Sequence, residues 1–264
     1  MTRTPPGSAP DTSLLRHDRR VGRLRLVVTG GADMSDNGSD GPRARLAAAL
    51  GVAPERLLLP RQVHAATVLT VDGLTDDGTA TVTLGASGGT DAASGWADGP
   101  PEADGLLVRG PGTAVGVLAA DCMPLLLGDP ERGLAAAVHV GRRGLHLGIA
   151  EVAVTRLVAA GATRLLAVVG PTVCGRCYEV PQELHDEVVA DVPAATARTR
   201  AGTPSLDIPA GVRAQLHAAA ARTGVPVEVD ESWAGCTIED PTSFSHRRDA
   251  PTGRHAAVVV VEPA

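Results

Sequence analysis

The feature that most constrains the fold is a run of short apolar segments between residues 103 and 151. Turn signals and polar residues, Asp121 and Cys122 among them, interrupt the apolar residues every few positions. The three clearest segments have the length and composition of buried strands, and they cover residues 114–119, 123–128 and 134–139. We therefore expect buried strands here, and we interpret the rest of the chain around them.

Side chains that bind metal ions stand at the ends of these segments. Cys122 follows the first segment, and His139 ends the third. Thiolate and imidazole are usual zinc ligands, at about 2.3 and 2.0 Å, and a catalytic zinc has three protein ligands and one open position. His64, at the start of another strand-like segment, is the best third ligand. The alternative is an ordinary buried thiol and a hydrogen-bonded core histidine, and spacing alone favours that alternative.

Composition restricts the chemistry that is open to the chain. Its 264 residues suit one sizeable α/β domain, and its net charge of −6 argues against a nucleic-acid partner. All 24 basic residues are Arg, so a Schiff-base lysine, a P-loop lysine and a lysine general base are excluded. Anions must therefore be bound by Arg side chains or by backbone amides.

Domain organisation and location follow from the N-terminus and the apolar runs. Residues 1–20 are rich in Pro, Thr, Ser and Arg, and we expect a flexible tail there, followed by one catalytic domain over residues 21–264. No apolar run approaches the roughly 18 residues that cross a bilayer, and the N-terminus lacks the apolar stretch of a signal peptide. We expect a cytoplasmic protein without a membrane partner.

Apolar periodicity predicts further elements of a mixed α/β protein. We expect strands within residues 24–29, 61–71, 164–170, 225–229 and 256–261, and helices over residues 43–50, 144–161 and 208–223. Residues 76–101 form a low-complexity insertion, with one short strand expected at 79–84. Cys174 and Cys177 form a CxxC motif, which by itself indicates a redox pair or half of a zinc site. Because no second CxxC exists, we favour neither interpretation.

Five sequence blocks together resemble a known bacterial family. In chain order they are QVH at residues 62–64, ADCMPLLL at 120–127, AVHVGRRG at 137–144, GPTVCGRCYEV at 170–180 and SFSHRRDAPTGRHAAVV at 243–259. They resemble the signature blocks of the YfiH-like proteins, also called DUF152, laccase-domain or multicopper polyphenol oxidase-like proteins. The resemblance implies a single α/β domain with mixed β-sheets sandwiched by helices. It also implies that His64, Cys122 and His139 are zinc ligands.

The chain departs from the family pattern in three places. Arg142 stands where the family usually has Trp, and His246 stands where it usually has Tyr. The loop after Gly31 is shorter than usual and lacks its typical Asn. We therefore do not carry over substrate contacts from that loop.

The resemblance also implies a substrate class. Family members phosphorolyse purine nucleosides, including methylthioadenosine, and deaminate adenosine. We expect a zinc-dependent purine nucleoside phosphorylase whose zinc lowers the pKa of a bound water toward about 7, and whose partners are the nucleoside and phosphate. The candidate catalytic residues are Asp121, Cys122 and His139. The candidate substrate- and phosphate-binding residues are Gln62, Arg143, Arg247 and Arg248, since guanidinium groups clamp oxyanions by bidentate hydrogen bonds.

Three alternatives remain open. The family also includes peptidoglycan editing factors, which resemble amidases that remove a wrong amino acid from a UDP-linked muramic acid precursor. A copper polyphenol oxidase is disfavoured because the chain has only eight His and no His-x-His, although copper can bind adventitiously to such a nitrogen and sulfur site. A non-enzymatic protein with structural zinc would need a fourth ligand, such as Cys174 or Cys236. The oligomeric state is open, with a monomer as one option.

Overall fold

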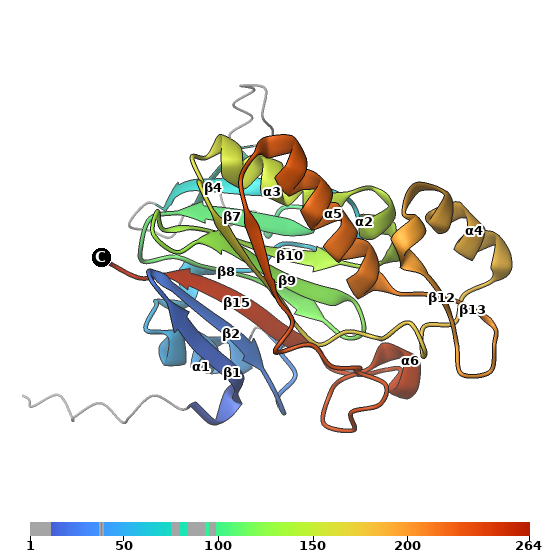
Figure 1. Cartoon of the computed structure of the whole chain (residues 1–264). Helices are drawn as coiled ribbons and strands as arrows, with labels where there is room; N and C mark the ends of the chain where they lie inside the picture. Colours follow the sequence, from blue (N-terminus) through green and yellow to red (C-terminus); the bar gives the residue numbers. More distant parts are fainter. Residues whose placement is uncertain (1–11, 37, 39, 75–79, 84–92, 95–98) are drawn as a thin grey trace, which may run out of the picture.

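Two mixed β-sheets lie face to face at the centre of the computed structural model, and helices cover their outer faces (Figure 1). The structure describes residues 12–36, 38, 40–74, 80–83, 93–94 and 99–264. One apolar core lies between the sheets, and a second and a third lie between each sheet and its helices. This arrangement confirms the expected single-domain α/β fold with mixed sheets sandwiched by helices.

The smaller sheet has the strand order β1-β2-β15-β8-β3. Its strands are β1 (Leu15–Val21), β2 (Leu24–Thr29), β15 (His255–Val261), β8 (Ala114–Ala119) and β3 (Leu57–Leu58). Neighbours are antiparallel except β3 and β8, which are parallel. Helix α1 (Pro42–Leu50) buries the outer face and ends at Gly51, whose φ of 73° is the left-handed conformation of a helix C-cap. The expected strands at 24–29, 114–119 and 256–261 and the expected helix at 43–50 are confirmed.

The larger sheet has the strand order β14-β11-β9-β10-β7-β4-β5-β6. Its strands are β14 (Val227–Asp230), β11 (Leu165–Val169), β9 (Met123–Asp129), β10 (Leu134–Val140), β7 (Gly105–Arg109), β4 (Val68–Leu74), β5 (Ala80–Thr83) and β6 (Ala93–Ser94). β11 is parallel to β14 and β4 to β7, and the other pairs are antiparallel. Strand β5 lies where a short strand was expected, and much of the surrounding low-complexity stretch lies outside the described residues.

Strands β9 and β10 are buried along their whole length, which explains their continuous apolar sequences. Successive side chains of a strand point to opposite faces of the sheet. Leu125 and Leu127 join the core under the helices, whereas Leu126 joins the core between the sheets. Because both faces of the sheet are covered, neither set of positions favours polar residues.

The helices over the larger sheet are α2 (Arg142–His146), α3 (Ile149–Ala159) and α5 (Ile208–Thr223), with α4 (Gln182–Asp191) beside them (Figure 1). The short elements are η1 (Thr12–Leu14), η2 (Pro54–Arg56), η4 (Pro193–Ala195), α6 (His246–Asp249) and the hairpin of β12 (Thr196–Arg198) and β13 (Pro204–Leu206). Helix α5 confirms the expected helix at 208–223. The single helix expected over 144–161 is wrong, because Gly148 adopts a φ of 76° and divides it into α2 and α3.

Residues 12–20, which we expected in a flexible tail, form η1 and most of strand β1. The sequence LRHDRRV hides this strand, because two of its four half-buried positions carry His17 and Arg19 rather than apolar residues. The Arg side chains of β1 form ion pairs with the C-terminal half of the chain: Arg16 with Asp240, Arg19 with Asp230 and Arg20 with Glu262. Within the described residues, none of the helices has both the length and the apolar character to cross a membrane.

Candidate metal centre

His64, Cys122 and His139 converge on one point of the structure. Their ligand atoms all lie within 4.8 Å of one another, and the Cys122 Sγ is 3.8 Å from the His64 Nε2. Ligands about 2.0–2.3 Å from a tetrahedral zinc are separated by roughly 3.3–3.8 Å, so a small contraction would close the three onto an ion. The structure therefore brings together the three residues that the sequence singled out.

Three separate parts of the fold deliver these ligands. His64 lies between β3 and β4 with a φ of 57°, Cys122 lies in the turn between β8 and β9, and His139 lies on β10. The turn also passes the chain from the smaller sheet to the larger one, which places Cys122 at the junction of the two sheets. At Gly141, a Cβ would approach the His64 ring to 2.9 Å and the Cys122 Sγ to 3.0 Å, so glycine keeps space open beside the ligands.

A buried carboxylate, Asp104, orients two of the ligands. Its Oδ1 accepts hydrogen bonds from the His64 backbone N–H and from the His139 Nδ1, both at 2.9 Å. Its Oδ2 accepts from the backbone N–H groups of Val63 and Ala65 at 3.2 and 2.7 Å. The bond to Nδ1 leaves the Nε2 of His139 as the ligand atom, which is the usual carboxylate–histidine arrangement at a metal. Our sequence reasoning missed Asp104, and its position directly before the apolar segment of β7 was the signal available.

The electrostatics of the cluster favour the thiolate form of Cys122. Burial opposes ionisation of this thiol, but hydrogen bonds and charge from His139 and His64 prevail and lower its pKa to about 6. Burial likewise opposes the charge on His139, yet the Asp104 carboxylate and the Cys122 thiolate raise the pKa of His139 to about 9. Burial also acts to raise the pKa of Asp104, and the hydrogen bonds from His139 and the backbone outweigh it and lower that pKa. A thiolate beside two imidazoles is a donor set that suits zinc.

A cavity of about 540 Å³ opens beside the three ligands, and its size is typical of small-molecule sites. Its walls come from β8, β10, the start of α2, the loop after β11 and the segment around α6. The lining residues are Pro60, Gln62, His64, Leu118, Ala120, Asp121, Cys122, His139, Val140, Gly141, Arg142, Val173, Tyr178, Ile208, His246, Arg247, Thr252 and Arg254. The candidate metal ligands therefore form part of the wall of a cavity.

Three arginines, Arg142, Arg247 and Arg254, belong to the cavity lining. The guanidinium of Arg247 lies 4.8 Å from the centre of the Tyr178 ring and donates to the Glu179 carbonyl at 2.8 Å. These contacts fix the Arg247 side chain and leave donors for a ligand. Among the described residues that line the cavity, Asp121 is the only acidic one, and the cavity therefore suits an anion.

The structure does not bring the other two expected phosphate ligands, Arg143 and Arg248, to the cavity. Arg143 is exposed and does not line it. The guanidinium of Arg248 donates to four backbone carbonyls, those of Thr237, Ile238, Asp240 and Ser243, and pairs with Asp249. Arg248 therefore holds the loop before α6 together.

Asp121 and Gln62 line the cavity, and the polar atoms of both side chains form hydrogen bonds within the protein. The Asp121 Oδ1 accepts from the Thr237 hydroxyl at 2.6 Å, and its Oδ2 accepts from the Arg247 backbone N–H at 2.7 Å. The Gln62 amide donates to the Leu118 carbonyl and accepts from the Leu118 N–H, which fixes the segment before His64 to strand β8. These bonds make both residues positioning groups, and a direct role in catalysis or substrate binding stays a prediction.

Comparison with known proteins agrees with the fold. The family model described as multi-copper polyphenol oxidoreductase laccase matches residues 33–262. The chain therefore belongs to this family, as the five sequence blocks indicated.

The relatives narrow the class further. A protein of Streptomyces coelicolor named purine nucleoside phosphorylase SCO2081 is 43% identical over 234 residues, which cover 87% of this chain and 86% of the relative. Purine nucleoside phosphorylase Rv2149c of Mycobacterium tuberculosis is 38% identical over 259 residues, or 92% of this chain and 93% of the relative. The solved structure of YlmD from Geobacillus stearothermophilus matches with a TM-score of 0.71 and 25% identity, covering 95% of this chain and 100% of YlmD. The chain is thus similar to enzymes named purine nucleoside phosphorylase.

Proposed function

We propose that this protein is a zinc-dependent purine nucleoside phosphorylase of the cytoplasm. The observation that carries the proposal is a cavity lined by the converging residues His64, Cys122 and His139 together with three arginines. A metal beside an anion site suits the attack of phosphate on the N-glycosidic bond of a nucleoside. The names of the relatives supply the substrate class.

The reaction joins a phosphate oxygen to the sugar C1′ and breaks the bond from C1′ to the base, which leaves with a proton. Arg142, Arg247 and Arg254 would bind phosphate and offset its charge. The Tyr178 ring forms a flat wall, and Arg247 already lies over it, which limits where the base can stack. Asp121 would keep Arg247 in place through the backbone N–H, so we assign it a positioning role.

Zinc held by His64, Cys122 and His139 would supply a Lewis acid with an open position. The same open position would serve adenosine deamination, in which water replaces the amino group, and methylthioadenosine would be a further phosphorolysis substrate. These two activities are part of the proposal. Gly141 and Asp104 support the fit of the metal, because one keeps space beside the ligands and the other fixes the histidine tautomer.

The test is the release of hypoxanthine from inosine by purified protein, with and without phosphate, and with the metal content measured on the same sample. We expect turnover to require phosphate and to fall at least about 100-fold in His64→Ala, since a lost ligand removes the metal. Arg248→Met serves as a control, because Arg248 lies outside the cavity. Equal turnover by wild type and His64→Ala would refute the metal-dependent mechanism. Hydrolysis of a UDP-linked muramoyl peptide without nucleoside turnover would instead support the editing amidase.

A further inference from the structure

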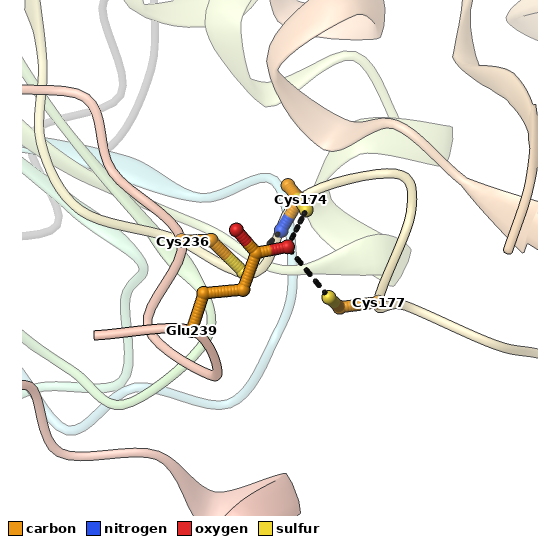
Figure 2. Close-up of side chains that lie close together, drawn as sticks. All are labelled: Cys174, Cys177, Cys236 and Glu239. Carbon is orange, nitrogen blue, oxygen red and sulfur yellow. Dashed lines mark hydrogen bonds between the residues drawn. The ribbon is translucent and has the colours of Figure 1, made fainter. Parts of the chain in front are cut away.

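Three cysteines and a glutamate meet at a second point, apart from the metal centre. Cys174 and Cys177 lie in the loop between β11 and α4, and Cys236 and Glu239 lie between β14 and α6. Their ligand atoms all lie within 4.8 Å of one another, and Figure 2 shows the Glu239 carboxylate reaching toward the Cys174 and Cys177 thiols. The CxxC motif therefore has the two additional partners that the sequence did not reveal.

The backbone holds these four side chains in a preformed arrangement. The N–H groups of Cys177 and Tyr178 both donate to the Cys174 carbonyl, at 2.9 and 3.0 Å, which turns the CxxC loop back on itself. The Cys174 N–H donates to the Cys236 Sγ at 3.5 Å across the two segments. The Glu239 Oε1 accepts from the Cys177 Sγ at 3.2 Å and from the Cys174 Sγ at 3.7 Å.

We propose that Cys174, Cys177, Cys236 and Glu239 form a second, structural zinc site, separate from the metal centre in the cavity. Four protein ligands complete the tetrahedral shell of a structural zinc, and neighbouring thiolates of such a shell lie roughly 3.8 Å apart. The four groups therefore need to move by less than about 1 Å to reach that spacing. Each thiol gives up its proton when the ion binds, so binding releases protons to solvent.

The surroundings fit a bound cation better than a redox dithiol. Reactive CxxC pairs carry a thiol whose pKa is lowered. Here burial and the neighbouring Cys236 raise the pKa of Cys174, and burial and the Glu239 carboxylate raise the pKa of Cys177 to about 12. A carboxylate beside thiols disfavours a free thiolate, but it is a natural fellow ligand to a divalent ion.

Arg200 offsets the charge that the filled site would carry. Three thiolates and a carboxylate around a divalent ion leave a net negative charge. The Arg200 Nη2 lies 2.6 Å from the Glu239 Oε1, and its Nη1 lies 3.7 Å from the Cys177 Sγ. Hydrogen bonds of this kind stabilise ligands around a metal from outside its own shell.

Such a site would tie two walls of the cavity together. Thr172 exchanges backbone hydrogen bonds with the segment around Cys236, accepting from Thr237 at 3.1 Å and donating to Gly235 at 2.9 Å. Thr237 in turn donates to Asp121, whose other oxygen holds Arg247. The proposed zinc would thus act on the cavity through the loops that carry Tyr178 and Arg247.

The experiment counts zinc rather than activity, so it is independent of the proposed reaction. Full-length protein is purified under reducing conditions with zinc in the medium, and zinc is measured by mass spectrometry. We expect about two zinc ions per chain in the wild type, about one in His64→Ala/Cys122→Ser, and none when Cys177→Ser is added to that pair. Glu239→Gln removes the carboxylate ligand, and Glu231→Gln is its matched control. Glu231 lies in the same segment and pairs with Arg213, so Glu231→Gln should keep the second zinc.

A second measurement leaves all four proposed ligands of the second site unchanged. Cobalt replaces zinc in the His64→Ala/Cys122→Ser protein, and three thiolates give an intense charge-transfer band that the cavity site, with one thiolate, cannot give. The proposal is overturned if this protein binds no metal under reducing conditions. It is equally overturned if its zinc survives both Cys177→Ser and Cys236→Ser, or if intact mass shows that Cys174 and Cys177 have lost two hydrogens to a disulfide.

Discussion

Replacing Asp104 by Asn gives the sharpest test of how the metal centre is built. The substitution keeps the shape of the side chain, but it exchanges one acceptor oxygen for a donor NH₂ group. In the protein, Asp104 accepts from four donors, three of them backbone N–H groups and one the Nδ1 of His139. Whichever way the amide turns, its NH₂ faces two donors that can no longer be satisfied.

The size of the effect follows from burial. Asp104 has no solvent-exposed surface, so water cannot replace the lost bonds. Each unsatisfied buried donor costs roughly 1–3 kcal/mol, which gives about 2–6 kcal/mol of folding stability for two of them. Loss of a carboxylate behind a histidine ligand typically weakens metal binding by roughly 10- to 100-fold. We therefore expect Asp104→Asn to lower both the melting temperature and the zinc affinity.

The assay compares Asp104 with another buried aspartate. Asp129 is also fully buried and accepts from four backbone N–H groups, those of Glu131, Arg132, Thr163 and Arg164, at the far end of β9. Zinc affinity is measured by competition with a chromophoric chelator in a Cys177→Ser background, so that the cavity site alone is titrated. Thermal unfolding is followed on the same samples.

We expect the two variants to lose similar stability, and only Asp104→Asn to lose zinc affinity. If Asp129→Asn weakens zinc binding as much, Asp104 acts through general stability and its assigned role is refuted. If neither variant changes zinc affinity, His139 is not held as a ligand by Asp104.

Three further predictions follow from the cavity and its ligands. Because the pKa of Cys122 is lowered to about 6, iodoacetamide should alkylate this thiol in the metal-free protein at a rate that rises through pH 6 and is level by neutrality. Cys177, whose pKa is raised to about 12, should stay unreactive. Equal alkylation rates of the two thiols at neutral pH would contradict the pairing of the Cys122 thiolate with His64 and His139. Arg247→Met should raise the KM for phosphate about tenfold or more, because one charge-assisted hydrogen bond is lost. Arg248→Met should lower the melting temperature and leave that KM unchanged. If Arg248 binds phosphate, steady-state kinetics would instead show a raised KM for phosphate in Arg248→Met. Gly141→Ala should weaken zinc binding in the chelator competition, since its Cβ would press on two ligands, and unchanged affinity would mean that the ligands sit elsewhere.

Local sequence was sufficient where one element's own pattern decides the outcome. The continuous apolar sequences of β8, β9 and β10 predict buried strands, and α5 begins and ends where its pattern does, between the Asp207 cap and Gly224. The same reasoning failed at β1, whose half-buried face carries His17 and Arg19 and so shows no apolar alternation. It also failed at Gly148, where one left-handed residue divides a helix.

The three candidate ligands could be chosen from chemistry and resemblance, because thiol and imidazole groups at strand ends are few in this chain. The residue that orients these ligands could not be chosen in the same way. Asp104 is one of many acidic residues in the sequence, and it becomes a ligand-orienting group only when β7 lies beside β10 and its carboxylate meets His139.

The arginines show most clearly what the sequence alone could not predict. The sequence supplies Arg142 and Arg143, and Arg247 and Arg248, as adjacent pairs of identical side chains, and in each pair only one lines the cavity. Which one it is depends on backbone direction at α2 and α6. Likewise the CxxC motif meets Cys236 and Glu239 only because two distant loops pack together. Residue types and short periods are local properties of the chain, so the sequence alone determined the buried central strands and the kind of ligands. Whether these side chains converge depends on sheet order and on the packing of loops that are far apart in the sequence, and the tertiary structure alone decided it.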